Sequence, residues 1–300
     1  MTQLPIPVLD EAIAQVAGEV DALFGELLTV PMDARQRLFE AMRHAAIGGG
    51  KRLRPLLVVA TASIFNVARS YAVRAGAALE SIHVYSLVHD DLPCMDDDNM
   101  RRGKPTVHRA YDEATAVLAG DALHALAFEI LSDPATHPDP FIRSELMATL
   151  ARASGPDGMA GGQMMDLEAE KASFDLPTVT RLQALKTGAL IAASVEMGAI
   201  LGHVPPEGRV HLRGYAHDIG LAFQIADDIM DVEGDPEAAG KALRKDADAG
   251  KATFVSLMGL ERAKQQAEML VDQSVSHLAG YGREADLLRA IARYVLERDR

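Results

Sequence analysis

The spacing of the prolines constrains this chain more than any other feature. Long blocks without proline run over residues 56–92, 106–133, 178–204, 207–235 and 237–300. Proline disrupts the interior of a helix, so these blocks are where long helices can run. Alanine, leucine, glutamate and methionine are abundant, and alternating strand patterns are scarce. The sequence therefore predicts an all-α fold.

The helical blocks are separated by short loop signals and not by linkers. Glycine and proline clusters lie at 48–50, 133–140, 154–156, 173–177 and 204–206. We find no low-complexity segment and no short repeat that would divide the chain. We therefore expect residues 1–300 to form a single domain, a large helical bundle.

Composition narrows the class of protein. The net charge of −13 argues against a nucleic-acid surface. The one cysteine, Cys94, excludes an internal disulfide and fits a reducing compartment. The N-terminus has no basic region, and no window holds the ~20 uninterrupted apolar residues of a membrane span. We expect a cytoplasmic protein with no nucleic-acid partner and no membrane span.

Two acidic clusters lie far apart in the chain, and basic residues follow each of them. The first contains Asp90, Asp91, Asp96, Asp97 and Asp98, and the second contains Asp227, Asp228 and Asp231. Crowded carboxylates repel one another unless a cation holds them together, and such oxygen ligands suit Mg²⁺, which completes its shell with water and phosphate. The pattern predicts a diphosphate site in a central cleft with two walls.

The spacing within each cluster limits its geometry. Asp227 and Asp231 are four apart, which puts both carboxylates on one face of a helix, and apolar flanks from Leu221 to Val232 predict that this stretch is largely buried. A solvated acidic face is the alternative. Asp90 and Asp96 would point about 120° apart on a regular helix. Because Pro93 makes such a helix doubtful, the residues alone leave open which of Asp96, Asp97 and Asp98 joins Asp90.

Further residues could bind a phosphate or another anion. Gly48–Gly50 followed by Lys51, Arg52 and Arg54 can present backbone N–H groups and cations to a phosphate, although a solvated basic turn fits equally well. Lys186-Thr187-Gly188 is expected to end a helical stretch. His83 and His89 lie on an otherwise apolar helix, where a core role is the commoner outcome.

Taken together, these motifs resemble the trans-isoprenyl diphosphate synthases, the polyprenyl synthetase family. The resemblance covers the chain from Gly49 to Arg298. His89–Asp96 with Arg101–Thr106 is similar to the family's first aspartate-rich motif, and Phe223–Asp231 to the second. Ala119–Leu123, Gly161–Gln163 and Lys186–Gly188 also stand where the family has them. The resemblance selects Asp96 as the partner of Asp90. Arg244-Lys245 and Asn99-Met100 depart from the family pattern.

The resemblance implies Mg²⁺-dependent prenyl transfer, in which isopentenyl diphosphate is condensed with an allylic diphosphate. The implied catalytic residues are Asp90, Asp91, Asp96, Lys186 and Asp227. The implied ligands of two or three Mg²⁺ ions are Asp90, Asp91, Asp96, Asp227 and Asp231. The allylic diphosphate would contact Arg101, Lys186, Thr187, Gln224, Lys241 and Lys251. Isopentenyl diphosphate would contact Lys51, Arg54, His83 and Arg102. The family also implies a homodimer.

The resemblance places a chain-length floor at Tyr85, five residues before Asp90, with Ser86 beside it. A bulky aromatic side chain there implies a C15 product, farnesyl diphosphate. Three alternatives remain: a C20 (geranylgeranyl) synthase, a class I terpene cyclase, and a non-catalytic partner subunit. A cyclase would not need a second basic site, and a non-catalytic subunit should have lost metal ligands that are intact here.

Overall fold

The computed structural model describes residues 6–233 and 252–297. The first part contains α1 (Ile6–Leu27), α2 (Gln36–Ala46), α3 (Leu53–Ile64), α4 (Arg69–Asp90), β1 (Met100–Arg101), β2 (Lys104–Pro105), α5 (Val107–Ala110), α6 (Glu113–Ser132) and α7 (Pro140–Ser154). Then follow α8 (Met159–Ala169), α9 (Leu176–Gln183), the π-helix η1 (Ala184–Gly188), α10 (Ala189–Leu201), the 3-10 helix η2 (Pro206–Arg209), α11 (Val210–Glu233), α14 (Phe254–Met258), α15 (Leu260–His277), the 3-10 helix η3 (Arg283–Ala285) and α16 (Asp286–Glu297). The all-α prediction is confirmed.

Three of the long helices begin where the sequence supplies a cap. Asp112, Asp139 and Asp175 precede α6, α7 and α9, and each side chain accepts a hydrogen bond from a backbone N–H of the first turn. Proline follows in the first turn of α7 and α9, where its missing N–H costs nothing.

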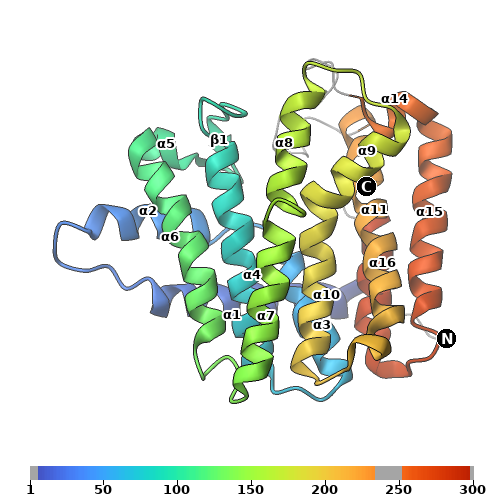
Figure 1. Cartoon of the computed structure of the whole chain (residues 1–300), viewed down its shortest axis with the longest axis horizontal. Coiled ribbons are helices and arrows are strands. Elements are labelled where there is room, and N and C mark those ends of the chain that lie inside the picture. Colours follow the sequence, from blue (N-terminus) through green and yellow to red (C-terminus); the bar gives the residue numbers. More distant parts are fainter. Residues whose placement is uncertain (1–5, 234–251, 298–300) are drawn as a thin grey trace.

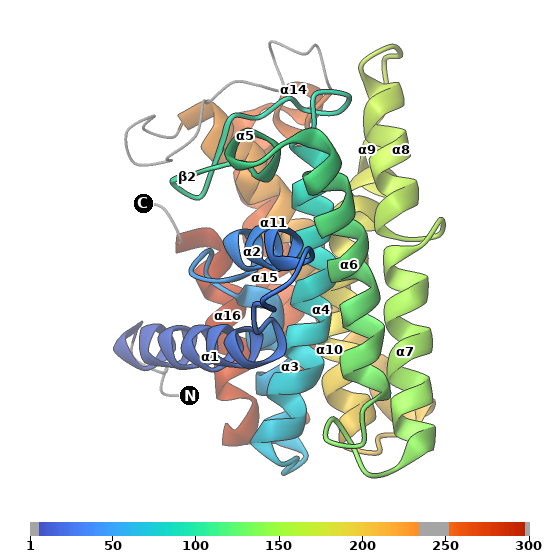
Figure 2. The same cartoon turned by 90° about the vertical axis from the view of Figure 1, so that its left-hand side faces the viewer.

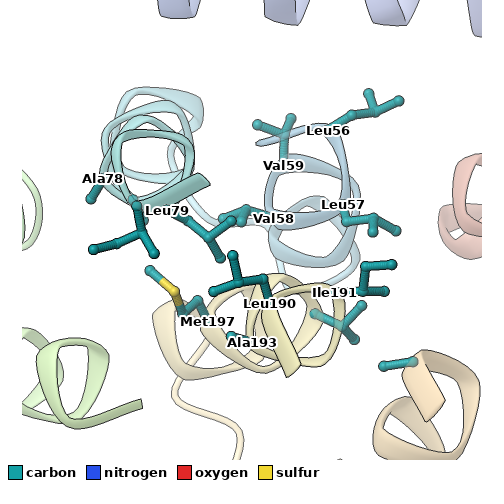
Figure 3. Packing of buried hydrophobic residues seen from close by; sticks show 14 of the residues in the cluster. Leu56, Leu57, Val58, Val59, Ala78, Leu79, Leu190, Ile191, Ala193 and Met197 are labelled. Carbon is teal, nitrogen blue, oxygen red and sulfur yellow. The ribbon is translucent and has the colours of Figure 1, made fainter. Parts of the chain in front are cut away.

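Helices α3, α4 and α10 form the centre of the bundle, and Figure 3 shows their buried side chains meeting. The contact between α3 and α10 depends on Gly198, because a Cβ there would lie 2.6 Å from Thr61 Cβ and 2.8 Å from the Val58 carbonyl oxygen. Close backbone approach leaves little void in this layer, as in other protein interiors.

Helix α1 runs across the long direction of the bundle, as Figure 2 shows, and it packs on α3 and α4 and buries Val16, Val20 and Phe24. At one end of the bundle lie the β1–β2 hairpin, the end of α4, the α8–α9 connection and α14 (Figures 1 and 2). This end therefore holds the first acidic cluster and the basic residues that follow it.

Two helical stretches, Glu113–Ser132 and Leu176–Leu201, are long and apolar enough to cross a membrane. The core helices of globular bundles have the same length and composition. Leu176–Leu201 contains the central helix α10, whose buried side chains face α3 and α4 (Figure 3), so packing inside the bundle accounts for its apolar character.

Candidate functional site

A cationic pocket of about 270 Å³ lies between the start of α3, the middle of α4 and the β1–β2 hairpin. Its lining includes Lys51, Arg54, His83 and Arg102, the four residues that the resemblance assigned to isopentenyl diphosphate. The chain reaches this geometry through a turn in which Gly48 and Gly50 have positive φ, a conformation that glycine adopts without strain. The structure thus gathers all four side chains into one concave surface.

Arg52 is the basic residue of this turn that faces the interior. Its guanidinium is bound 2.7 Å from Glu80 Oε1 and 2.7 Å from Asp21 Oδ1, and it also donates to the Ala46 carbonyl. Arg52 and Glu80 are almost fully buried. Arg52 therefore anchors the turn to α4 and α1, and it borders the same pocket as its neighbours Lys51 and Arg54.

His83 and Arg102 contact each other inside the pocket. Arg102 Nη2 lies 3.4 Å from His83 Nε2, and Arg102 Nη1 donates to the Gly49 carbonyl at 3.2 Å. Burial, together with Arg54 and Arg102, holds the pKa of His83 well below its usual value. Since arginine can only donate, Nε2 of a neutral His83 is the acceptor. The pocket therefore has a strong positive field that an anion would relieve.

The first acidic cluster begins where α4 ends at Asp90. The chain then turns back, and the Asp96 N–H donates to the Asp90 carbonyl at 2.8 Å. The turn around Pro93 thus brings Asp96 to Asp90, the pairing that the resemblance favoured.

Arg101 faces the first acidic cluster, whereas its neighbour Arg102 faces His83. Arg101 Nε donates to Asp91 Oδ1 at 2.6 Å, and Nη2 lies 3.4 Å from Asp98 Oδ2. Burial raises the pKa of Asp90 and of Asp91 to about 6, despite Lys186 near the first and Arg101 beside the second. The cluster is therefore unfavourably charged as it stands, and an added cation would stabilise it.

The prediction that Lys186-Thr187-Gly188 ends a helical stretch is wrong. The segment lies within a continuous run of helix in which η1 joins α9 to α10, so the backbone makes one wide turn and continues. Such π-turns are rare and occur often at functional sites. The turn is packed against α8, since a Cβ on Gly162 would lie 2.2 Å from the Lys186 backbone nitrogen.

The side chain of Lys186 has a carboxylate partner that the sequence reasoning missed. Lys186 Nζ lies 2.8 Å from Asp166 Oδ2, and Asp166 is largely buried on α8. Asp166 is four residues after Gly162, so both lie on the face of α8 that meets η1. The four-residue spacing of Gly162 and Asp166 is the sequence feature that could have predicted this carboxylate partner. Lys186 is also close enough to Asp90 to lower its pKa, which places it beside the first acidic cluster.

Helix α11 carries the second acidic cluster, and Asp227 and Asp231 share one face of it as their spacing predicted. Asp228 is buried and accepts the Phe254 N–H at 2.7 Å, so it fixes the start of α14. Gln224 is buried, and its Nε2 donates to Gln183 Oε1 at 3.1 Å. The expectation of burial fails for Val232, which is 47 % exposed near the end of the helix.

Tyr85 lies below Asp90 on α4, and its ring contacts α6. Its centroid is 5.0 Å from that of His124, edge to face, and the His124 ring is 5.4 Å from that of Phe128. Burial, with Asp90 nearby, raises the pKa of Tyr85. The Ser86 hydroxyl donates to the His83 carbonyl at 2.9 Å. Tyr85 therefore stands one turn before the acidic cluster with its ring against His124, which in turn packs on Phe128.

His89 contacts α6 at two points. Its Nε2 lies 3.1 Å from the Val117 carbonyl, and a Cβ on Gly120 would lie 2.0 Å from Nε2. This packing explains why Gly120 has no side chain and gives His89 a structural contact.

Some of the assigned residues lie outside the described part of the chain, namely Lys241, Arg244, Lys245 and Lys251. Thr187 is half-buried in η1. Among residues 6–233 and 252–297, no three His, Cys, Asp or Glu side chains are close enough together to hold a metal ion by themselves. The donor set nevertheless fits Mg²⁺, which commonly takes one or two carboxylates and completes its shell with water and phosphate.

Sequence comparison identifies the family. Residues 35–287 match the model of the family described as polyprenyl synthetase. A farnesyl diphosphate synthase of Escherichia coli is 46 % identical over 267 residues, which cover 87 % of this chain and 89 % of the relative. Geranylgeranyl pyrophosphate synthase 3 of Arabidopsis thaliana is 43 % identical over 275 residues, which cover 89 % and 76 %.

Solved structures share the fold. An apo FPP/GFPP synthase from Zymomonas mobilis superposes with a TM-score of 0.88 and 59 % identity, covering 96 % of this chain and 98 % of that one. A geranyltransferase from Helicobacter pylori, complexed with magnesium and isoprenyl diphosphate, gives a TM-score of 0.80 at 33 % identity, covering 96 % and 97 %.

Proposed function

This chain belongs to the polyprenyl synthetase family, and from that premise we propose how its residues act. It is a prenyltransferase that condenses isopentenyl diphosphate with an allylic diphosphate, as its farnesyl diphosphate synthase relatives indicate. The observation that carries the proposal is the cationic pocket, because it joins four residues from three separate segments into one anion site.

The cationic pocket binds the diphosphate of isopentenyl diphosphate. Lys51, Arg54 and Arg102 supply the positive charge, and neutral His83 supplies one further polar contact. Arginine side chains suit this task because their planar forks match phosphate oxygens. Arg52 keeps the turn in place from behind through Glu80.

The acidic clusters bind the second, allylic substrate together with two or three Mg²⁺ ions. The ligands would be Asp90, Asp91, Asp96, Asp227 and Asp231. When bound, Mg²⁺ stabilises the departing pyrophosphate. The raised pKa of Asp90 and Asp91 and the magnesium complex of the H. pylori neighbour support this assignment.

The chain's own cations complete the allylic site. Lys186 and Arg101 lie beside Asp90 and Asp91 and contact the diphosphate, with Thr187 on the same turn. Gln224, Lys241 and Lys251 would contact the same group. Apolar walls between the two sites exclude water from the allylic cation. Its capture by the double bond of isopentenyl diphosphate forms the new C–C bond, and released pyrophosphate accepts the proton.

The product would be farnesyl diphosphate, since Tyr85 stands five residues before Asp90 on α4, where a bulky ring would stop the growing chain. The Tyr85 ring packs edge to face against the rings of His89 and His124, which would limit its rotation. Ser86 lies beside it with its hydroxyl bound to its own helix. The C20 alternative shares every other feature, and a geranylgeranyl synthase is among the relatives.

The chain works as a cytoplasmic homodimer. Helix α6 supports a dimer, since Val117 and Leu118 on it are exposed although the helix is apolar enough on average to cross a membrane. A second copy would cover this face. The single cysteine, Cys94, is exposed and fits a reducing compartment.

A product assay tests the function. Purified protein is incubated with Mg²⁺, isopentenyl diphosphate and either dimethylallyl or geranyl diphosphate, and the dephosphorylated alcohols are separated by length. We expect a dominant C15 alcohol, and a shift to longer products for Tyr85→Ala. A wild-type C20 product would keep the reaction and overturn the role of Tyr85. The absence of condensation would favour the cyclase or the partner subunit.

A further inference from the structure

A tyrosine of the C-terminal helix lines the cationic pocket. Tyr294 belongs to α16, whose Leu288, Ile291 and Val295 are buried in the core. Tyr294 lies beside this apolar stripe, half-buried, and lines the pocket together with Phe223 of α11. The last helix thus brings a ring to a site that also draws on α3, α4, α11 and the hairpin.

The Tyr294 ring contacts one of the pocket's cations. Lys51 Nζ lies over the ring, 5.3 Å from its centroid. An ammonium within about 6 Å of an aromatic centroid is attracted by the negative face of the ring. Lys51 has a long, flexible side chain, so such a contact restricts where its ammonium lies.

The charge of the pocket explains why an aromatic ring is suited to this position. Lys51, Arg54 and Arg102 line the pocket, and Glu80, the carboxylate beside them, is already bound to Arg52 at 2.7 Å. A ring attracts the cation without adding net charge, so it can orient Lys51 and leave the field for the substrate.

We propose that Tyr294 is a positioning residue, which holds the Lys51 ammonium over the cationic pocket so that it meets the diphosphate of isopentenyl diphosphate. The inference rests on the proposed function, since it names the residue that prepares one of its two substrate sites. It also gives the C-terminal helix a part in binding the substrate.

Two substitutions separate the ring from the hydroxyl. Tyr294→Leu keeps an apolar side chain but removes the π-face, so the KM for isopentenyl diphosphate should rise ~3- to 10-fold, the value of one cation–π contact. The kcat and the KM for the allylic substrate should stay within about twofold. Tyr294→Phe keeps the ring and should restore the wild-type KM to within about twofold.

Two further variants test whether the effect passes through Lys51. In a Lys51→Met background, Tyr294→Leu should add little, because the cation it orients is gone. Tyr281→Leu makes the same change at a half-buried ring that packs on Phe65, and it should leave the KM for isopentenyl diphosphate unchanged.

The outcomes are distinct. An unchanged KM in Tyr294→Leu, an equal loss in Tyr294→Phe, or an equal rise in both substrates' KM would overturn the role of Tyr294. Calorimetric titration with isopentenyl diphosphate alone gives a second readout, in which Tyr294→Leu should weaken binding by the same factor. Wild-type protein that binds this ligand without forming product would overturn the proposed function and still allow the binding test of Tyr294.

Discussion

Adjacent carboxylates on α11 differ in what they contact. Asp228 is buried and accepts a backbone N–H from Phe254, whereas Asp227 lies on the face that carries Asp231. Neighbouring residues on a helix point about 100° apart, so one acidic motif can serve both the fold and the site. The two residues should therefore respond differently to the same substitution.

Replacing each of these aspartates by asparagine separates binding from stability. Asp227→Asn should lower turnover by orders of magnitude and leave thermal unfolding nearly unchanged, because it weakens a proposed metal ligand. Asp228→Asn should lower the free energy of unfolding by ~1 kcal/mol, because a buried charge-assisted hydrogen bond becomes a neutral one. Steady-state kinetics and urea unfolding measure the two effects. Near-wild-type turnover in Asp227→Asn would exclude its role as a ligand.

His83 should make stability depend on pH. Because the pKa of His83 is lowered in the folded protein, its imidazole is protonated below about pH 6.5 in the unfolded chain but stays neutral in the folded protein. The stabilising contribution is complete above that pH and is lost as the pH falls toward the lower pKa of the folded state. Between about pH 7.5 and 5.5, wild type should lose ~1 kcal/mol more than His83→Gln, which can still accept from Arg102. Equal pH slopes in urea unfolding would contradict this.

The basic turn shows what the sequence could and could not predict at single residues. The resemblance assigned Lys51, Arg54 and Arg102 to one substrate, and all three line one pocket, whereas Arg52 in the same run is buried and paired with carboxylates. Its direction depends on a left-handed backbone conformation and on partners in α1 and α4. Neither is visible in a local pattern, because both depend on contacts between distant segments.

At the scale of elements, proline spacing predicts where the long helices run, but not the π-turn at Lys186. A π-turn inserts one residue into a helix and does not require proline or glycine. No residue type in the sequence therefore marks its position. The visible signal is indirect, since Gly162 and Asp166 on α8 provide the space and the charge that the turn needs.

Two glycine substitutions test whether the packing of α8 on η1 matters for function. Gly162→Ala forces α8 away from the Lys186 backbone, and Gly198→Ala forces α10 away from α3. Both should destabilise the protein by ~1–3 kcal/mol, as overpacking does. Only Gly162→Ala should also lower the turnover of the protein that remains folded, because it displaces Lys186. Equal specific activities of the two variants, measured well below their unfolding temperatures, would contradict this role for the contact.

At the scale of the whole molecule, the bundle brings the first acidic cluster, the hairpin and the α8–α9 connection to one end (Figure 1). The sequence predicted the helical class and a cleft with acidic walls. It could not predict that α1 would cross the bundle and hold the basic turn through Asp21, because that contact joins segments 31 residues apart. Long-range contacts of this kind decide where a site lies within a fold.

The exposed apolar residues of α6 predict where two copies of the chain meet. The helix has the hydropathy of a membrane span, yet only 44 % of its most apolar window is buried within one chain. Leu118, 57 % exposed, should lie in a dimer interface, where a charge would be desolvated without a partner. Leu118→Arg should therefore convert a dimer into a monomer in light scattering at micromolar concentration. Val210→Arg, at an equally exposed apolar residue on α11, should leave the dimer intact. A monomeric wild type would contradict the dimer itself. A Leu118→Arg variant that remains dimeric would place the subunit contact away from Leu118.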